Sequence, residues 1–340
     1  MKESMLYDKL SKNSVRCHLC AHECKIAEGR KGICKVRENK GGTLYTLVYG
    51  HTISQHVDPV EKKPLQHFYP GSRAYSIATV GCNFHCQWCQ NADISQLPRE
   101  RKYFLGEEYS PDEIVAAAKR TDCRSIAYTY TEPTIFFEYA YDIARLAHEQ
   151  NIANIFVTNG YMTEEMLDTF DPYLDAANVD LKAFRDETYR EYVGARLQPV
   201  LDSLKKMKEV GIWLEVTTLI VPGINDDEGE IRDAARFVSQ ELGPETPWHI
   251  SRFYPAYQMR TTPPTPVAKI KRAQEIGQEE GLRYIYIGNL PGESNTTCHQ
   301  CGHTLIRRSG HQVIENEITQ DEACPKCETP VAGVGVQGSQ

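Results

Sequence analysis

The sequence has no apolar run long enough to cross a lipid bilayer, for which a helix needs about 20 mostly apolar residues in succession. Its first residues also lack the apolar segment of a secretory signal peptide, because Lys2 and Glu3 interrupt them. Basic residues are not in excess: 38 Lys and Arg stand against 46 Asp and Glu, a formal net charge of −8 over 340 residues. This balance argues against an extended nucleic-acid-binding face. These absences predict a cytoplasmic protein that acts on neither membranes nor nucleic acids.

Cysteine, in contrast, is abundant, with 12 residues in a chain of globular composition. In a cytoplasmic protein such cysteines are more typical of metal ligands than of disulfides. Cys123 stands alone beside a probable buried strand and is expected to be a packed thiol. The others form three sets: Cys17, Cys20, Cys24 and Cys34; Cys82, Cys86 and Cys89; and Cys298, Cys301, Cys324 and Cys327. Two sets of four and one set of three predict two closed metal sites and one open site.

The central set has the spacing C-x3-C-x2-C, in a loop that starts at Gly81 and carries Trp88 directly before the last cysteine. Three thiolates can hold three irons of a [4Fe–4S] cluster. The fourth iron is then open to a chelating substrate. A zinc site lacking one ligand is the alternative, but structural zinc sites close with four ligands. The spacing therefore favours an open iron–sulfur cluster, which Phe84 and Trp88 can shield.

From about residue 74 the sequence alternates strand-like runs with helical runs. Ser110 to Glu113 form a capping box, with Pro111 at the first helical position. Strands are expected at 74–80, 124–130, 152–158, 176–181, 213–221, 248–253 and 284–287, and helices at 111–120, 134–150, 164–170, 199–210, 227–241 and 266–280. Repeated β-then-α units imply a parallel sheet with helices outside it. The sheet is either open and doubly wound, or a full or partial barrel.

Polar residues follow the ends of these expected strands, which favours the barrel. They are the cysteine triad, Glu132, Asn159, Asp180 with Lys182, Arg252 with Tyr254 and Tyr257, and Asn289, while the turn residue Gly223 follows the fifth strand. Active sites of β/α barrels are built at the carboxyl ends of all strands, whereas an open sheet concentrates its chemistry at one switch point. We therefore expect an α/β fold whose core, residues 74–290, is a partial barrel of the (β/α)6 type.

Small Cys-rich metal modules are expected at both ends of this core. Residues 1–50 form the N-terminal module, and residues 51–73 form a linker into the barrel. The N-terminal spacing C-x2-C-x3-C-x9-C includes His18 and His22 and suits zinc, with a second iron–sulfur cluster as the open alternative. Residues 291–340 carry two C-x2-C knuckles, as in zinc ribbons and rubredoxins. Few aromatic residues lie near these knuckles, which favours a zinc that is independent of the central cluster.

The run Cys82–Asn91 resembles the signature of the radical S-adenosylmethionine (SAM) superfamily. With Thr131-Glu132-Pro133, Thr158-Asn159-Gly160, Asp180-Leu181-Lys182 and Val221-Pro222-Gly223, it is similar to the pyruvate formate-lyase activating enzyme group. The resemblance implies that SAM binds the open iron through its amino and carboxylate groups. It also implies that an electron from the cluster cleaves SAM to methionine and a 5′-deoxyadenosyl radical.

The same resemblance assigns cofactor-binding roles to five residues. Glu132 would accept the ammonium of SAM, although it could equally be a helix-capping neighbour. Thr158 and Asn159 would contact the ribose or carboxylate of SAM, although Asn159 before Gly160 also suits a turn. Asp180 and Lys182 lie on one face of a strand, point into the barrel and are the expected catalytic residues. Buried charges need partners, which are SAM, a monovalent cation or each other.

Nearly the whole chain is similar to the radical SAM member of the AmmeMemoRadiSam system. The closer match is carried by Asp58–Leu65, Pro247–Phe253, the N-terminal cysteines and the C-terminal ribbon. It implies Memo-like and AMMECR-like partner proteins and a reductant such as flavodoxin or ferredoxin. The sequence departs from the activating-enzyme pattern at Val157, where that group often has an acidic cation ligand, and at Pro255-Ala256-Tyr257 instead of a Pro-Tyr-His ending. The cation site and glycyl-radical formation are therefore not carried over.

Three functions are compatible with these features. The first is hydrogen abstraction from a protein or peptide substrate, as an activating enzyme performs it. The second is the same radical chemistry on a small metabolite, with partner proteins docking on the metal modules. The third is a non-catalytic electron-transfer or zinc scaffold, against which the open cluster site argues. A peptide substrate requires an open groove, and a small metabolite requires a closed pocket.

Overall fold

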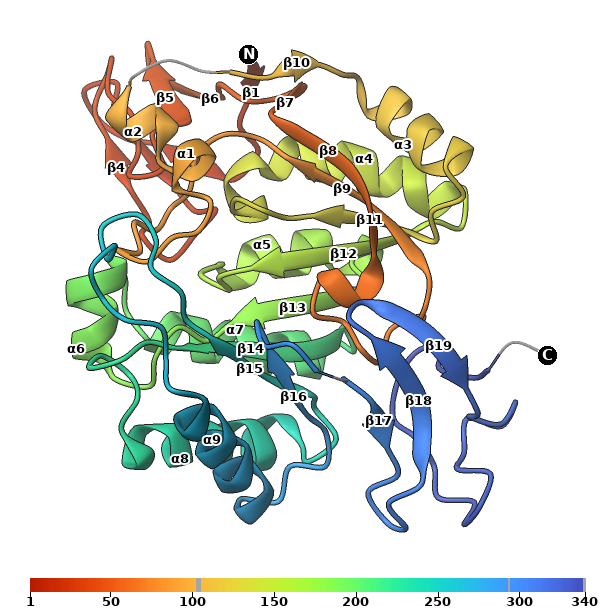
Figure 1. The fold of residues 1–340 in the computed structure, drawn as a ribbon. Coiled ribbons are helices and arrows are strands. Elements are labelled where there is room, and N and C mark those ends of the chain that lie inside the picture. The colour runs from red at the N-terminus through yellow and green to blue at the C-terminus, as the bar shows by residue number, and fades with distance from the viewer. Residues whose placement is uncertain (102–104, 293, 339–340) are drawn as a thin grey trace.

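The computed structural model describes residues 1–101, 105–292 and 294–338. Its core is an α/β unit on an eight-stranded sheet (Figure 1). Adjacent strands from β9 to β16 are parallel, and the edge strand β8 is antiparallel to β9. The strands are, in spatial order, β16 (Ile285–Gly288), β15 (Trp248–Arg252), β14 (Trp213–Ile220), β13 (Ala176–Asp180), β12 (Ala153–Thr158), β11 (Ser125–Tyr128), β9 (Arg73–Ala78) and β8 (Ser54–Pro59).

The spatial order of the strands follows the chain without a reversal. A doubly wound sheet contains a point where the order reverses, so that alternative is wrong. The expected parallel strands are confirmed, because each of β9 and β11–β16 falls at its expected position within a few residues. The carboxyl ends of these parallel strands lie along one edge, where the polar residues that follow them can meet.

The helices of the β/α units lie outside the sheet (Figure 1). They are α3 (Pro111–Arg120), α4 (Phe137–Glu149), α5 (Glu164–Phe170), α7 (Gln198–Glu209), α8 (Glu228–Phe237) and α9 (Val267–Glu279), with short α1 (Ala92–Ser95), α2 (Leu97–Glu100) and α6 (Asp186–Thr188). The capping box of α3 is confirmed, because the Glu113 amide donates to the Ser110 hydroxyl and the Ser110 amide donates to the Glu113 carboxylate. None of the helices in the described ranges is both long and apolar enough to span a membrane.

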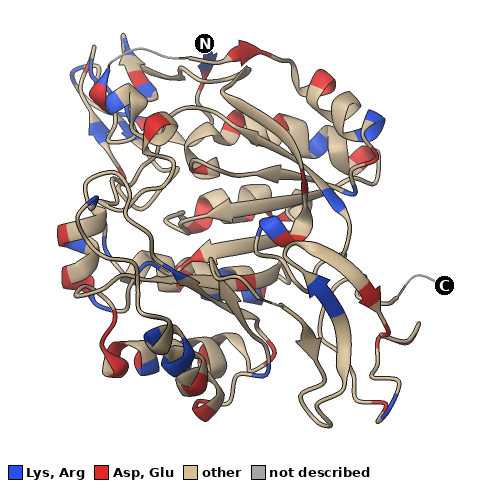
Figure 2. Cartoon of the chain, in the orientation of Figure 1, with Lys and Arg blue, Asp and Glu red and all other residues tan. Residues whose placement is uncertain are grey.

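Charged residues are frequent on the outer helices, and most residues of the strands of the central sheet are uncharged (Figure 2). On α8 and α9 both signs are interspersed and paired. Arg232 of α8 contacts Glu279 at 2.6 Å and Glu280 at 2.8 Å at the end of α9. Exposed pairs of this kind stabilise a fold by only ~0.2–1 kcal/mol each. The apolar faces that these helices bury therefore contribute more to the core than their ion pairs do.

Residues 51–73, expected as a linker into the barrel, contain regular structure. Within them, Ser54–Pro59 form β8, which pairs with β9 along its full length. After a 3-10 turn, η1 (Val60–Lys62), the side chains of Leu65 and Phe68 pack into a second apolar cluster with Ala74. Strand β8 has an exposed edge and few β-branched residues, so it carries little strand signal of its own. Pairing with β9, a nonlocal contact, decides its conformation.

The N-terminal module contains two small antiparallel sheets. The first sheet consists of β1 (Lys2–Glu3), β6 (Thr43–Thr46) and β5 (Arg37–Lys40), and the second of β2 (Tyr7–Lys9), β3 (Val15–Cys17) and β4 (Lys25–Ile26). After the module, β7 (His51–Thr52) pairs with β10 (Glu107–Glu108). Apolar side chains such as Leu19 and Val36 belong to the main core. Arg37, 2% exposed, forms a buried ion pair with Glu138 of α4. The module is thus packed onto the barrel and shares its core.

The C-terminal module is a three-stranded sheet of β17 (Thr296–Thr297), β18 (Thr304–Ser309) and β19 (Gln312–Asn316), beside η1 in Figure 1. Its Arg308 is buried and donates hydrogen bonds of 2.8 Å to the Gln66 carbonyl oxygen and to the Thr296 hydroxyl. A parallel bridge joins Phe68 to Val334. These contacts attach the module to the segment that follows β8.

Candidate active site

A cavity of about 340 Å³ lies where the strands β11–β16 end. The cysteine triad, Glu132, Asn159, Asp180, Lys182 and Asn289 all line it, so the structure brings together residues from loops that are far apart in the sequence. Phe84, Trp88, Thr129, Tyr130, Thr131, Val157, Thr158, Thr217, Leu219, Ser251, Lys62 and Lys63 are also among the lining residues.

Four residues expected at this mouth do not line the cavity. They are Gly223, Arg252, Tyr254 and Tyr257. Arg252 stacks over the ring of Tyr254 at 5.0 Å and donates a 2.7 Å hydrogen bond to the Thr265 carbonyl oxygen. The Tyr257 hydroxyl donates to Glu100. These side chains are used in contacts outside the cavity.

The triad loop is held in place by its own backbone. The amides of His85 and Gln87 donate to the carbonyl oxygens of Val193 and Tyr192, at 3.0 and 3.1 Å. Gly81 opens the loop with φ +105°, a backbone conformation that residues with a side chain rarely adopt. The backbone is therefore anchored on both sides of Cys86.

The thiols of Cys82 and Cys86 are protonated unless a metal binds them. Burial raises the pKa of Cys82 well above its usual value and raises the pKa of Cys86 to about 12. Metal binding needs thiolates and must therefore release protons here. The Asn159 side-chain amide lies 3.9 Å from the Cys82 sulfur and the Ser95 hydroxyl lies 3.3 Å from the Cys89 sulfur. Such donors stabilise metal-bound thiolates.

Two aromatic side chains form the wall of this site, as the sequence suggested. Phe84 is 1% exposed and Trp88 is 2% exposed, and both line the cavity. Phe84 meets Tyr161 edge-on, with the ring centroids 5.2 Å apart. Val157 also lines the cavity, so the position at which activating enzymes often have an acidic residue is apolar here.

Glu132 is buried, and its carboxylate is already hydrogen-bonded on every side. It accepts bonds from the Thr134 amide at 3.0 Å, the Thr134 hydroxyl at 2.6 Å, the Thr158 hydroxyl at 2.7 Å and the Asn159 amide at 2.8 Å. A carboxylate offers about four acceptor positions. Glu132 thus joins the ends of β11 and β12, and its direct contact with SAM stays a prediction.

Asn159 is committed to the triad loop. Its side-chain amide donates a 2.8 Å hydrogen bond to the side-chain oxygen of Asn83, and its own side-chain oxygen accepts from the Tyr161 amide at 3.0 Å. Thr158 donates to Glu132 and accepts from the Gly160 amide at 3.1 Å. The turn role weighed from the sequence is therefore present, and the structure adds support of the cysteine loop.

Asp180 and Lys182 form an ion pair beside the thiols. The Lys182 ammonium lies 2.6 Å from an Asp180 carboxylate oxygen, and their side chains are 19% and 32% exposed, respectively. Burial opposes the charge on Lys182, but Asp180 and Cys86 raise its pKa above the usual value. Both side chains line the cavity, as the strand alternation predicted.

Lys62 and Lys63 are functional candidates that were not assigned from the sequence. Lys63 is 2% exposed, donates to Asp58 at 2.6 Å and lies over the ring of Tyr130 at 4.4 Å. Burial lowers the pKa of Lys63 to about 8. The signal available in the sequence was a pair of lysines next to apolar residues, which is too common to identify a site. Their position at the cavity depends on the pairing of β8 with β9.

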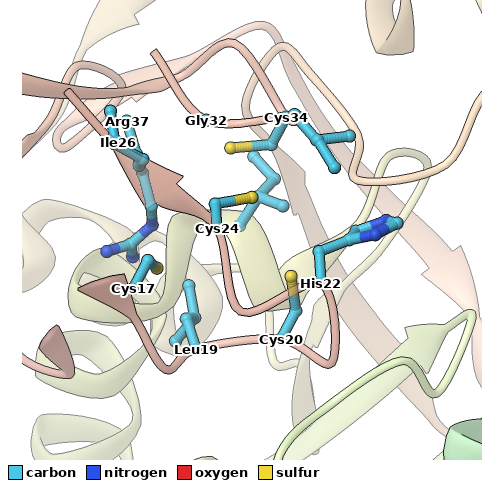
Figure 3. A pocket seen from close by; sticks show the side chains of 11 residues that line it. Cys17, Leu19, Cys20, His22, Cys24, Ile26, Gly32, Cys34 and Arg37 are labelled. Carbon is cyan, nitrogen blue, oxygen red and sulfur yellow. The ribbon is translucent and has the colours of Figure 1, made fainter. Parts of the chain in front are cut away.

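The C-terminal cysteines form a compact group. All four sulfur atoms lie within 4.8 Å of one another. Cys298 and Cys327 are 3.6 Å apart, and Cys301 and Cys324 are 3.7 Å apart. This group could hold one metal ion. The four N-terminal cysteines, Cys17, Cys20, Cys24 and Cys34, line a separate small cavity (Figure 3).

Comparison with known proteins adds to this geometry. A family model described as Radical SAM superfamily matches residues 76–238. The chain is 46% identical over 310 residues to an uncharacterized protein of Methanocaldococcus jannaschii, covering 91% of this chain and 92% of that one. It is 25% identical over 178 residues to the pyruvate formate-lyase-activating enzyme of Clostridium pasteurianum, covering 50% of this chain and 70% of that one. A radical SAM methyltransferase from Sphaerobacter thermophilus is similar in fold, with a TM-score of 0.51 at 19% identity over 65% of this chain and 67% of that one.

Proposed function

Because this chain belongs to the radical SAM superfamily, we propose that it cleaves SAM reductively and abstracts a hydrogen atom from a protein or peptide substrate. The observation that carries the proposal is that Cys82, Cys86 and Cys89 share one cavity with Asp180 and Lys182. When bound, a [4Fe–4S] cluster supplies one electron to SAM, and SAM supplies the 5′-deoxyadenosyl radical that takes the hydrogen atom.

The donor set fits such a cluster. Iron–sulfur clusters are held by cysteine thiolates, and within the described part of the chain Cys82, Cys86 and Cys89 are the cysteines that line the cavity. Three thiols leave one iron without a protein ligand, which is the position that SAM requires. The thiols also lie near hydrogen-bond donors from Asn159 and Ser95.

The ion pair supplies opposite charges for SAM. Lys182 can bind the carboxylate of SAM, and Asp180 can face its ammonium or its sulfonium. Neither side chain is fully buried, so each can contact a ligand while the ion pair between them stays intact. Glu132 and Asn159 hold the strand ends and the triad loop in position.

The size of the cavity favours a protein or peptide substrate. About 340 Å³ lies at the low end of the ~300–1,000 Å³ that small-molecule sites occupy, and SAM itself would take much of it. A side chain of a protein can enter the remaining space from outside, whereas a second whole molecule has little room. The similarity to an activating enzyme, whose name describes action on another enzyme, supports the same choice.

We propose a partial barrel of the (β/α)6 type, supported by the strand order, and a zinc ion in the C-terminal set, supported by its compact thiols. A cytoplasmic location is proposed as well. The sequence resemblance supports membership of the AmmeMemoRadiSam system, Memo-like and AMMECR-like partners, and a flavodoxin or ferredoxin as reductant. The run Asp58–Leu65, which carries part of that resemblance, places Lys63 at the cavity.

The test is anaerobic incubation of the iron-loaded protein with SAM and dithionite, with 5′-deoxyadenosine measured by mass spectrometry. The Cys82→Ala/Cys86→Ala/Cys89→Ala variant should form none, and the control Cys123→Ala, outside all three sets, should match the native chain. Continued SAM cleavage by the triple variant would contradict the proposal. Size-separated fractions of a lysate of the source organism then identify the substrate class: stimulation by the protein fraction supports it, and stimulation by the small-molecule fraction contradicts it.

A further inference from the structure

The N-terminal cysteine set lies directly against the triad loop. A Cβ atom at Gly81 would lie 3.4 Å from the carbonyl oxygen of Cys34. Nearby, the Nε2 atom of His22 lies 3.0 Å from the carbonyl oxygen of Asn83. The segment that carries the set therefore lies beside both sequence neighbours of Cys82, which are Gly81 and Asn83.

The N-terminal set differs from the C-terminal set in the distances between its sulfur atoms. Four thiolates around a zinc ion at ~2.3 Å lie ~3.8 Å apart, and the C-terminal pairs at 3.6 and 3.7 Å match this. Among the four N-terminal cysteines, all of which are described, no three sulfur atoms lie within 4.8 Å of one another. The same is true of the triad. Wide spacing suits a cluster in which each thiolate binds a different iron.

A buried cation provides a second and independent observation. Arg37 lines the same small cavity as the four thiols (Figure 3). One of its terminal nitrogens, Nη2, pairs with Glu138, but Nε and Nη1 have no hydrogen-bond partner among the described residues. An unpaired buried donor costs ~1–3 kcal/mol. A negatively charged cluster with sulfur acceptors would satisfy these donors.

The set also has access to the surface. Cys20, Cys24 and Cys34 are partly exposed, whereas Cys17 is buried. A group bound here would thus be reached from outside on one side and would contact the triad loop on the other. That is the placement required of an electron relay.

We propose that Cys17, Cys20, Cys24 and Cys34 hold a second [4Fe–4S] cluster, which passes electrons to the cluster of the triad. A low-potential one-electron donor protein loses one electron to the N-terminal cluster. The N-terminal cluster then returns to its oxidised state as the triad cluster is reduced by one electron, and no covalent bond forms or breaks. The relay rests on the proposed function, whereas the identity of the cluster does not. The N-terminal set then holds an iron–sulfur cluster instead of zinc, the metal that its spacing in the sequence favoured.

The identity of the cluster is tested in the Cys82→Ala/Cys86→Ala/Cys89→Ala variant, which cannot cleave SAM. After anaerobic loading with iron and sulfide it should retain ~4 irons and ~4 sulfides per chain, with the electron paramagnetic resonance signal of a reduced [4Fe–4S] cluster. Zinc without sulfide in the N-terminal set would overturn the proposal. Because this variant could fold poorly, the native chain provides a second measurement: Cys24→Ala/Cys34→Ala should lower its iron from ~8 to ~4 per chain, and Cys123→Ala should not.

The relay is tested by comparing two reductants. The rate of 5′-deoxyadenosine formation with reduced flavodoxin is divided by the rate with dithionite, a small molecule that can reach the triad directly. In Cys24→Ala/Cys34→Ala this ratio should fall by an order of magnitude or more relative to the native chain, and in Cys123→Ala it should not change. An unchanged ratio in the double variant would overturn the relay. Iron analysis decides the cluster even if SAM cleavage fails, so the two proposals fail separately.

Discussion

The Lys182 ammonium lies 2.6 Å from a carboxylate oxygen of Asp180, beside the three thiols of the central loop. The two residues are separated by one position in the sequence and project toward the same cavity. Asp180 raises the pKa of Lys182 above its usual value against the effect of burial, so the amine stays charged at neutral pH. The pair is thus a fixed source of one positive and one negative charge next to the cluster site.

Lys182→Ala and Asp180→Ala should each weaken SAM binding while the cluster remains. A hydrogen bond to a charged group contributes ~1.5–3 kcal/mol, which corresponds to a ~10- to 100-fold rise in Kd. The measurement is SAM titration by calorimetry, with iron content as the check on the cluster. Lys271→Ala, on the exposed face of α9, is the control. If both cavity variants bind and cleave SAM as the native chain does, the pair has no role toward SAM.

Glu132→Gln should destabilise the fold by ~1–3 kcal/mol, because the new amide group places a donor opposite one of the four donors that the carboxylate now satisfies. Chemical denaturation measures the change in the free energy of unfolding. Glu113→Gln, in the exposed capping box of α3, is the control and should change stability much less. A variant with native stability and weak SAM binding would instead make Glu132 a SAM ligand.

Asp58→Asn should leave the buried Lys63 without its acidic partner and destabilise the fold by ~3–5 kcal/mol. Burial opposes ionisation of Asp58, but hydrogen bonds from Lys62, Lys63 and Tyr130 hold its pKa below the usual 3.8. A depressed carboxyl pKa stabilises the fold above about pH 4, and this contribution is lost as the pH falls through the folded pKa. The stability difference between native chain and variant should therefore shrink below pH 4 in urea unfolding at stepped pH. A constant difference would contradict the role of this carboxylate.

Removal of Cys298 and Cys301 by substitution with serine should unfold the C-terminal module without loss of the triad cluster. The module has a small apolar core, so its metal should supply much of its folding free energy. Metal analysis should show the loss of zinc with unchanged iron, and limited proteolysis should cleave after about residue 291. Iron with a rubredoxin-like visible spectrum in the native chain would contradict zinc.

Since Arg308 donates a hydrogen bond to the Gln66 carbonyl oxygen, loss of the C-terminal module is also expected to weaken SAM binding next to Lys63.

Local features of this protein could be read from its sequence. The C-x3-C-x2-C loop, the capping box at Ser110 and Glu113 and the alternation that places Asp180 and Lys182 together depend on residues a few positions apart. Helix and strand periods are constant, so spacing fixes the geometry of the capping box and of the Asp180–Lys182 pair, whereas for the cysteine loop it indicates only which thiols can share a cluster. The parallel strands and their polar carboxyl ends were predicted for the same reason.

Tertiary structure decided what depends on distant partners. Strand β8 exists because β9 pairs with it, and this pairing brings Lys63 to the cavity. Two of the four donors on Glu132 come from Thr134, close in the sequence, but the other two come from Thr158 and Asn159 at the end of β12, and only the folded chain brings these to the carboxylate. The sequence assigns four cysteines to each terminal set, but only the folded chain shows that the thiols lie closer together within the C-terminal set than within the N-terminal set. Sequence spacing limits which thiols can share a metal, whereas the packing of the whole chain sets how far apart they lie and therefore what they can hold.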